Sequence, residues 1–299
     1  MFDLIVIGAG PAGITAGVYA ARKRMDVLII AEDIGGQTAW SGDIENYTGY
    51  QFITGPELTA KFEEHIKKYN IQLKEGERAT DIKKEGDIIS VKTSKNTYQA
   101  KTAIVASGAS PRELNAQGEK EFKNKGLTYC ATCDAPLFSN KDVAVVGGGN
   151  SGLDATLQLI KIANHIYLIN IASKLTGDKI MQDKIKMSNK VTVLNNTQVS
   201  AVLGDKLVTS IRVKTDGKES TLSVQGVFVE IGLTPDSKFA KILEKNEIGE
   251  IKINAYNETN IPGIFAAGDV TDVPDKQIII AAGEGSKAAL SAFKYLSRL

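Results

Sequence analysis

Two copies of one glycine-rich pattern constrain this chain more than any other feature of its sequence. Residues 8–13 (GAGPAG) and residues 147–152 (GGGNSG) each follow a short apolar run that is typical of a buried parallel strand. In such a strand–turn–helix unit, the first glycines let the backbone turn tightly beside a pyrophosphate, and the third lets the helix pack closely on the strand. The N-terminus of the helix then faces the negative charge. The repeat, offset by 139 residues, predicts an α/β chain with two dinucleotide-binding units for two different nucleotides.

The first unit carries an acid where a dinucleotide site needs one. A second apolar run at residues 27–30 leads to Glu32, whose carboxylate is placed to bind the ribose hydroxyls of an adenine dinucleotide. Gly36 and Gln37 follow in a loop-like stretch, and close backbone of this kind suits a dinucleotide that runs along the sheet edge. An ordinary connector is the alternative interpretation of that stretch.

The second unit lacks such an acid. Its second strand, at residues 165–169, ends at Asn170. An acid at this position would favour a free ribose, and an arginine cluster just after it would bind a 2′-phosphate. Neither is present, and Lys174 is expected to be a solvated lysine. The sequence therefore favours NADH over NADPH.

The two cysteines of the chain, Cys130 and Cys133, lie in a C-x-x-C pattern. This spacing lets the sulfurs close a small disulfide loop, and a thiol in the pattern commonly has a lowered pKa, so the pair is interpreted as a redox switch. A zinc half-site is one alternative, although tetrahedral zinc needs four ligands and the chain offers only His65 and His165 besides. Two inert buried thiols are the other. Asp134, directly after the pair, is placed to relay a proton when the disulfide opens.

The C-terminal part repeats the theme of a strand that ends at an acid. An apolar run at residues 263–268 leads to Asp269, which is suited to present its carboxylate to a ribityl or phosphate-linked sugar; a helix cap or turn residue is the alternative. Residues 277–282 are expected to precede the final helix, whose N-terminal dipole would stabilise negative charge on a reduced isoalloxazine. Glycine and proline at residues 108–111 and 232–235 predict crossings between two domains.

Composition narrows the class of partner. With 36 basic and 35 acidic side chains the net charge is +1, so no broad attraction to nucleic acid or to an anionic membrane is expected. The sequence has no run of eighteen apolar residues, so no spanning helix is expected, and it does not start like a secretion signal. Two cysteines without such a signal fit a reducing cytoplasm.

The whole chain resembles the low-molecular-weight thioredoxin reductase family and is especially similar to the reductase portion of alkyl hydroperoxide reductase flavoproteins. The resemblance is carried by the two glycine turns, Gly35-Gly36-Gln37, residues 44–47 (IENY), residues 129–134 (YCATCD) and residues 263–269 (GIFAAGD). It implies two Rossmann-like domains of the three-layer ββα type, with the second inserted into the first. Residues 1–109 and 235–299 would form an FAD-binding domain, and residues 110–234 a nicotinamide-binding domain that carries the redox disulfide.

The resemblance also implies an activity. An FAD-dependent thioredoxin-disulfide reductase would pass electrons from a reduced nicotinamide through FAD and the Cys130/Cys133 disulfide to a thioredoxin- or glutaredoxin-like protein. Cys133 would face the flavin, Cys130 would attack the partner's disulfide, and Asp134 would be the acid. A cytoplasmic homodimer is expected, with rotation between the domains, because one pair of sulfurs cannot touch a buried flavin and a bulky protein at once. Since no thioredoxin-like extension precedes Met1, a separate carrier protein is expected.

Three alternatives stay open. The partner can be a peroxiredoxin system, within the same flavin chemistry. The donor can be a ferredoxin or a deazaflavin, because NADPH-using members carry His-Arg-Arg, and NADH-using members an acid, where this chain has Asn170, Ile171 and Ala172. Outside disulfide chemistry, an NADH oxidase or a redox sensor would fit the two nucleotide units.

The candidate cofactor-binding residues form two sets. In the first unit they are Gly8, Gly10, Pro11, Ala12, Gly13, Glu32, Gly36, Gln37, Asn46, Gly108, Asp269 and Gln277. In the second unit they are Gly147, Gly149, Asn150, Ser151, Gly152 and Asn170. No metal site is predicted.

Overall fold

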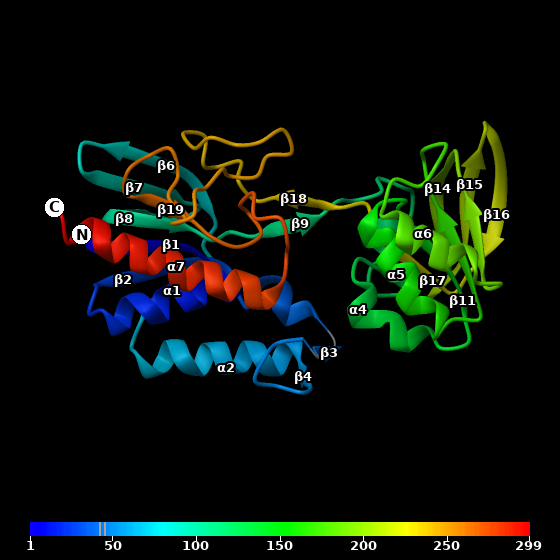
Figure 1. Cartoon of the computed structure of the whole chain (residues 1–299), viewed down its shortest axis with the longest axis horizontal. Coiled ribbons are helices and arrows are strands. Elements are labelled where there is room, and N and C mark those ends of the chain that lie inside the picture. Colours follow the sequence, from blue (N-terminus) through cyan, green and yellow to red (C-terminus); the bar gives the residue numbers. More distant parts are fainter. Residues whose placement is uncertain (42, 45) are drawn as a thin grey trace. The chain divides into compact units, whose positions relative to one another are not determined.

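A computed structural model describes the chain except for Gly42 and Glu45, and it describes no side chain for Trp40, Asp43, Thr132 and Cys133. Met1–Ser110 and Thr234–Leu299 form one compact unit, and Pro111–Leu233 form a second (Figure 1). The second unit is therefore an insertion in the first. The predicted α/β class with two Rossmann-like domains is confirmed.

The first unit is built on a seven-stranded sheet. Across the sheet, the strands are β5 (Gln72–Glu75), β2 (Val27–Ile34), β1 (Phe2–Ala9), β8 (Thr97–Val105), β7 (Ile88–Thr93) and β6 (Ala79–Glu85), and β19 (Ile264–Ala266) also pairs with β8. Strands β5, β2, β1, β8 and β19 pair in parallel, whereas β8, β7 and β6 form an antiparallel meander. Strand β8 thus belongs to both layers.

Period-two burial along β1 separates the two faces of this sheet. Leu4 and Val6 pack in a cluster with the helices α1 (Pro11–Arg22) and α7 (Ile278–Leu296). Ile5 and Ile7 pack in another cluster with β6 and β7. Since successive side chains of a strand point to opposite faces, this division gives helix, parallel sheet and meander as three layers. The remaining elements of the unit are η1 (Gly36–Trp40), β3 (Asp43–Ile44), β4 (Ile53–Thr54) and α2 (Gly55–Lys68).

The final helix starts earlier than the sequence predicts. Residues 277–282 are expected to precede it, but α7 begins at Ile278, directly after its N-cap Gln277. Its first turns pack closely on α1, and a Cβ atom at Gly285 would lie only 2.0 Å from the carbonyl oxygen of Ala12. This tertiary packing outweighs the strand preference of three consecutive isoleucines.

The second unit repeats the three layers. Its parallel sheet has the order β10 (Leu127–Thr128), β17 (Gly226–Val229), β11 (Asp142–Val146), β12 (His165–Ile169) and β13 (Val191–Leu194). One face packs on a meander of β14 (Thr197–Gly204), β15 (Val208–Thr215) and β16 (Lys218–Ser223). The other face packs on helices that include α5 (Asn150–Ile160) and α6 (Lys179–Lys186). Short helices α3 (Glu119–Phe122), α4 (Ala131–Asp134) and η2 (Ala135–Phe138) precede β11.

The chain passes between the units along two short paired strands, β9 (Ala109–Pro111) and β18 (Leu233–Pro235). The N–H of Asp236 donates to the carbonyl of Gly108, and the N–H of Arg112 donates to the carbonyl of Gly232, each at 3.0 Å. Both glycines have a positive φ, +70° and +96°, which a side chain would strain. The glycines at the two crossings therefore meet a conformational requirement.

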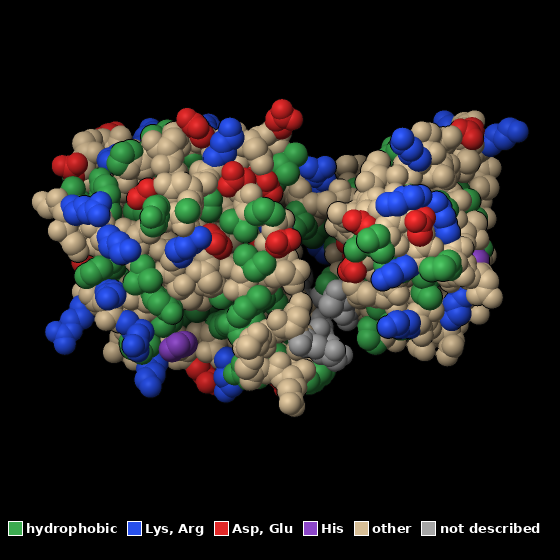
Figure 2. Space-filling view, viewed as in Figure 1, with side chains coloured by type: hydrophobic (Ala, Val, Ile, Leu, Met, Phe, Trp, Pro, Cys, Tyr) green, Lys and Arg blue, Asp and Glu red, His purple; other side chains and the backbone are tan. Residues whose placement is uncertain are grey.

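Two surface properties can be read from the structure. On the face drawn in Figure 2, both units carry basic as well as acidic side chains, in keeping with a net charge of +1. Within the part of the chain that the structure describes, no helix combines the length and apolarity that a bilayer crossing requires.

Candidate functional site

The first glycine turn joins β1 to α1 in the way a dinucleotide cradle requires. Gly8 has φ +111°, and a Cβ atom there would lie 2.2 Å from the carbonyl oxygen of Ala106. A Cβ atom at Gly13 would lie 1.9 Å from the carbonyl oxygen of Gly8. At Gly10, by contrast, the nearest atom would be 3.9 Å away, in Gly35. Two of the glycines are required by the protein itself, whereas Gly10 leaves its side open for a ligand.

Helix α1 begins at this turn, so the positive end of its dipole lies at the glycines. Pro11 occupies the first turn, the N-cap Gly10 offers no side-chain cap, and the first turn has no acidic residue. The unpaired N–H groups and the helix dipole therefore favour an anion in front of the turn. Ala12, which is buried, packs against Gly268, where a Cβ atom would lie 3.0 Å from the Ala12 methyl carbon.

Glu32 lies at the end of β2 as an exposed carboxylate. It is paired with Arg78, with a nitrogen–oxygen distance of 3.6 Å between two exposed side chains. Such a pair adds little stability, so Glu32 keeps its carboxylate available to a ligand. Gly36 begins the helix η1 with φ +54°, so the stretch predicted to be a loop is a short 3-10 helix.

Two pairs of predicted residues that are far apart in the sequence meet in the first unit. The side-chain amide of Gln37 donates to the carbonyl of Ala109 at 3.0 Å and to Asp269 at 3.5 Å. The side-chain amide of Asn46 donates to Gln277 at 3.1 Å. Burial raises the pKa of the Asp269 carboxyl above its usual value, and the nearby Lys276 opposes this shift. Polar side chains from both segments of the unit thus converge at the N-terminus of α7.

The second glycine turn reproduces the first. Gly147 has φ +141°, and a Cβ atom there would lie 2.1 Å from the carbonyl oxygen of Glu230. A Cβ atom at Gly152 would lie 2.0 Å from the carbonyl oxygen of Gly147, whereas one at Gly149 would have nothing nearer than 4.0 Å. Helix α5 follows at Asn150, with Ser151 exposed in its first turn. This turn is therefore also built to leave one glycine open.

Asn170 serves the loop that closes on this turn. It is only 5% exposed, and its side-chain amide donates to the carbonyl of Ala172 at 3.0 Å and to Asn195 at 2.9 Å. The N–H of Thr176 donates to the carbonyl of Gly148 at 2.8 Å. The Asn150 side chain accepts the N–H of Asp178 at 2.7 Å. Asn170 thus shapes the loop with a buried amide instead of presenting that amide to solvent.

The two cysteines lie in a segment, residues 128–134, that is held by its neighbours; we call it the cysteine segment. The Thr128 hydroxyl donates to the Asp134 carboxylate and accepts the N–H of Cys130 at 3.1 Å. The N–H of Asp134 donates to the carbonyl of Cys130 at 3.2 Å. None of the described cysteines is free, and the side chain of Cys133 lies outside the described part. The predicted acid and the first cysteine are therefore linked through one buried threonine.

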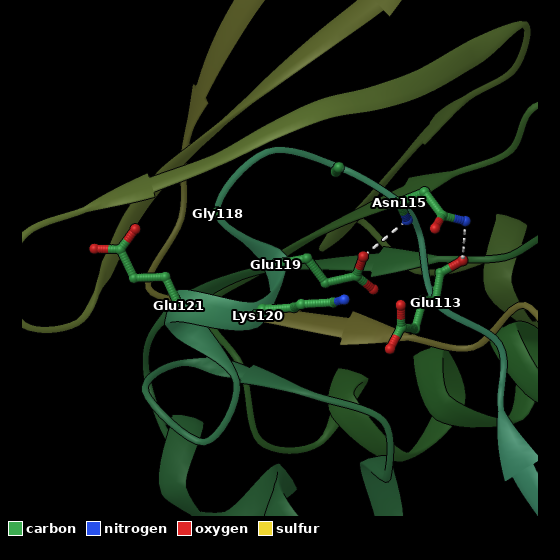
Figure 3. Close-up of a pocket in the computed structure, with 7 residues that line it drawn as sticks. Glu113, Asn115, Gly118, Glu119, Lys120 and Glu121 are labelled. Carbon is green, nitrogen blue, oxygen red and sulfur yellow. Dashed lines mark hydrogen bonds between the residues drawn. The ribbon is translucent and has the colours of Figure 1, made fainter.

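Tyr129 anchors the start of the same segment by bonding to Glu119, one of the residues that line the hollow in Figure 3. The drawn hollow is lined by Glu113, Asn115, Ala116, Gly118, Glu119, Lys120 and Glu121. The Glu119 carboxylate turns away from solvent and accepts the N–H groups of Leu114 and Asn115 at 2.6 and 2.7 Å and the Tyr129 hydroxyl at 2.7 Å. Burial and this bond raise the pKa of Tyr129. Glu119 thus has a structural role in this hollow, because its carboxylate already accepts three hydrogen bonds from the protein.

Glu230 is a further residue that contacts the cysteine segment, and sequence reasoning missed it. Its side chain accepts the N–H of Ala131 at 3.1 Å, across 99 residues of chain. Burial raises the pKa of Glu230 to about 7, the N–H of Ala131 opposes this shift, and Asp154 adds to it. The sequence held one signal: Glu230 follows β17 as Ala106 follows β8, so the repeat aligns a carboxylate with a methyl group.

Comparison with known proteins decides the family. The model of the pyridine nucleotide-disulphide oxidoreductase family matches residues 2–286. The chain belongs to this family. Its resemblance to low-molecular-weight thioredoxin reductases is confirmed by the structure of thioredoxin reductase from Streptococcus pyogenes MGAS5005, at 36% identity and a TM-score of 0.82 over 100% of this chain and 99% of that one. A pyridine nucleotide-disulphide oxidoreductase of this type uses FAD and a pyridine nucleotide.

Two curated relatives of this oxidoreductase carry different names. One, the F component of the alkyl hydroperoxide reductase of Staphylococcus aureus (strain MSSA476), is 44% identical, and the NADH dehydrogenase of Bacillus subtilis (strain 168) is 42% identical. Each match covers 99% of this chain but 59% of the relative. The chain thus spans about three fifths of the length of the curated relatives it matches.

Proposed function

We propose that this protein is an FAD-dependent disulfide reductase that passes electrons from NADH to a thioredoxin- or glutaredoxin-like protein through Cys130 and Cys133. The observation that carries the proposal is the cysteine segment, which is anchored in the same unit as the second glycine turn. In this segment the Thr128 hydroxyl joins the Asp134 carboxylate to the backbone N–H of Cys130. Such an arrangement suits thiol–disulfide exchange, in which a thiolate attacks and a proton has to be supplied.

The first unit is assigned to FAD, whose isoalloxazine would carry an electron pair between the nicotinamide and the disulfide when bound. The open side of Gly10 and the start of α1 would hold the pyrophosphate. Glu32 would bind the ribose hydroxyls, and the partly buried Asp269 with Gln37 would hold the sugar-like chain. The residues present fit the group, because the cradle has no side chain where the pyrophosphate would lie.

The second unit is assigned to the nicotinamide nucleotide. Gly149 leaves its turn open, and Asn150 and Ser151 begin the helix behind it. After β12 stand Asn170, with its amide engaged inside the loop, and the exposed Ile171. Neither group is a cation for a 2′-phosphate, so we assign NADH as donor over NADPH. The relative named NADH dehydrogenase supports this assignment.

Asp134 is assigned as the acid of the exchange. Its carboxylate accepts the Thr128 hydroxyl, which also accepts the N–H of Cys130, so the carboxyl group is held at a fixed place relative to the Cys130 backbone. Cys130 would attack the partner's disulfide and Cys133 would face the flavin. The reaction would take place in the cytoplasm, with the protein as a homodimer.

Trapping of a mixed disulfide tests the function directly. With Cys133→Ser, a thioredoxin-like partner should accumulate on Cys130, because the resolving sulfur is missing, while Cys130→Ser should trap little. Both variants should lose NADH-driven disulfide reduction. An NADH oxidase would instead keep its oxygen-dependent NADH consumption in both variants and show no disulfide turnover in the wild type, and that result would refute the proposal.

A peroxiredoxin system is a second candidate partner, favoured by the 44% identity to a component of alkyl hydroperoxide reductase. Parallel assays with thioredoxin, a glutaredoxin and a peroxiredoxin as disulfide substrates separate the candidates by kcat/KM. The donor is tested by anaerobic bleaching of the flavin with NADH, NADPH, reduced ferredoxin and reduced deazaflavin. Bleaching by NADH at the lowest concentration is expected, and bleaching by ferredoxin alone would overturn the donor assignment.

A further inference from the structure

The repeat within the molecule singles out Glu230. After β8, the N–H of Ala106 donates to the carbonyl of Ile7 at 2.8 Å; after β17, the N–H of Glu230 donates to the carbonyl of Val146 at 2.8 Å. The carbonyl oxygen of Ala106 lies 2.2 Å from where a Cβ atom of Gly8 would be. The carbonyl oxygen of Glu230 lies 2.1 Å from where a Cβ atom of Gly147 would be. The two backbones thus correspond, but only the second unit places a carboxylate at this point.

That carboxylate contacts the cysteine segment. It accepts the N–H of Ala131, while the neighbouring N–H of Cys130 is accepted by the Thr128 hydroxyl. Two consecutive amides of the segment are thus held from two sides, one by Glu230 and one by the threonine that also binds Asp134. A change in the charge of Glu230 would therefore strengthen or weaken its hydrogen bond to Ala131, the residue that follows Cys130.

The surroundings of Glu230 bring its protonation into the physiological range. Its pKa is raised to about 7 by burial and also by Asp154 of α5, against the opposing bond from Ala131. Among the described residues of the adjoining elements, Asp134 lies in the cysteine segment and Asp142 begins β11, the strand that pairs with β17. Arg112 belongs to the adjoining crossing, but its guanidinium donates to the carbonyl of Leu233 at 3.2 Å. Within the described part of the chain, Glu230 has no ion pair, so no cation bound to it holds its carboxylate in the charged form.

We propose that Glu230 takes up a proton when the Cys130–Cys133 disulfide is reduced and that it positions the cysteine segment through Ala131. This inference rests on the proposed function. Reduction breaks the S–S bond with two electrons supplied by the reduced nicotinamide. One sulfur takes a proton and the other remains a thiolate, which adds one negative charge. The hydride accounts for the proton on the sulfur, and the added charge favours uptake of a second proton, from solvent, by the Glu230 carboxylate.

A redox titration of the full-length, FAD-loaded protein over pH 5.5–9 tests the proposal, with the fraction of free thiols as readout. The matched variant is Glu230→Gln, which keeps an oxygen to accept the N–H of Ala131 but cannot titrate. Just above pH 7, the dithiol/disulfide ratio of the wild type should change with pH by up to a further tenfold per pH unit compared with the variant, or about 30 mV. Glu113→Gln, which removes an exposed carboxylate of the same unit, should follow the wild type.

Two outcomes separate the failures. If the wild type interconverts dithiol and disulfide but Glu230→Gln has the same pH slope, the inference about Glu230 is wrong and the proposed function stands. If the wild type never interconverts the two forms, the proposed function fails. Should Glu230→Gln not fold, Asp154→Asn tests the same coupling, because removing this like charge should move the steep region to lower pH. An unmoved steep region would then overturn the proposal.

Discussion

The two glycine turns of this oxidoreductase have the same backbone conformation but differ in the side chains around them. Gly8 and Gly147 both have a strongly positive φ, and a Cβ atom at Gly13 or at Gly152 would lie 1.9 or 2.0 Å from the carbonyl oxygen of the first glycine. Beyond the turn, however, the first unit ends its second strand with the exposed Glu32 and the second unit with the buried Asn170.

The comparison separates the glycines that the dinucleotide-binding fold requires from the side chains that determine which ligand each unit binds. The glycine contacts recur because helix, strand and turn cannot approach otherwise. The residues near the ends of the second strands take no part in these glycine contacts and differ between the units: Glu32 is exposed, and Asn170 shapes a loop. The four predictions that follow test this separation, first at the shared positions and then at those that differ.

The largest loss of stability is expected at Gly13 and Gly152, where protein backbone fills the space that a side chain would need. Gly13→Ala and Gly152→Ala place a methyl group 1.9 and 2.0 Å from a backbone oxygen, so the helix must move away from the strand. Each variant should lose about 3 kcal/mol or more of stability, at the upper end of overpacking costs. Thermal unfolding and soluble yield measure this loss. Similar stability to the wild type would mean that the turns are looser than described.

The open glycines should behave in the opposite way. Gly10 and Gly149 have φ −76° and −91°, which alanine adopts readily, and their Cβ atoms would meet no protein atom closer than 3.9 Å. Alanine should therefore leave unfolding unchanged or slightly improved but weaken nucleotide binding about 10- to 100-fold, or about 1.4–2.8 kcal/mol.

Binding measurements assign each open glycine to its ligand. Gly10→Ala should lower FAD content in the purified protein, and Gly149→Ala should raise the KM for NADH while FAD content stays normal. The reverse pattern would exchange the two assignments. If FAD and NADH binding both stay normal, the open sides are not pyrophosphate sites.

The turns were predictable because their information is local. An apolar strand, closely spaced glycines and a helix pattern stand within about fifteen residues, so residues 8–13 and 147–152 could be located from the sequence alone. The meeting of Gln37 with Asp269, and of Asn46 with Gln277, spans more than 230 residues. Each of these residues was predicted from its own local pattern or from the family resemblance, and only the fold brings them together.

Burial was what sequence reasoning could not supply. Asn170 was predicted from its position after β12, but its amide turned inward depends on Asn195, another 25 residues along the chain. Glu230 was not among the predicted site residues, because its contact with Ala131 is made across 99 residues. The start of α7 was misplaced for the same reason, since its packing partner α1 lies at the other end of the chain.

A smaller effect is expected at the strand ends, where the units differ. Asn170→Ala removes three hydrogen bonds from a buried site and leaves the Asn195 oxygen without that donor, which should cost about 1–3 kcal/mol. Glu32→Ala breaks only an exposed pair at 3.6 Å and should cost less than about 1 kcal/mol, although it should weaken FAD binding. Unfolding curves and FAD content measure both. Equal destabilisation by the two variants would contradict the division between a loop-shaping and a ligand-facing strand end.

The smallest effect concerns the position where Ala106 and Glu230 correspond. Because the pKa of Glu230 is raised to about 7, the folded state binds more protons than the unfolded state between about pH 4.5 and 7. Stability from this group is therefore present at low pH and falls as pH rises through about 7. Relative to Glu230→Gln, the wild type should lose about 1 kcal/mol between pH 6 and pH 8, a fall of about 2–4 °C in the unfolding temperature. Ala106→Gln, the corresponding change in the first unit, should leave this pH dependence intact, and a pH dependence that survives in Glu230→Gln would place its origin in another group.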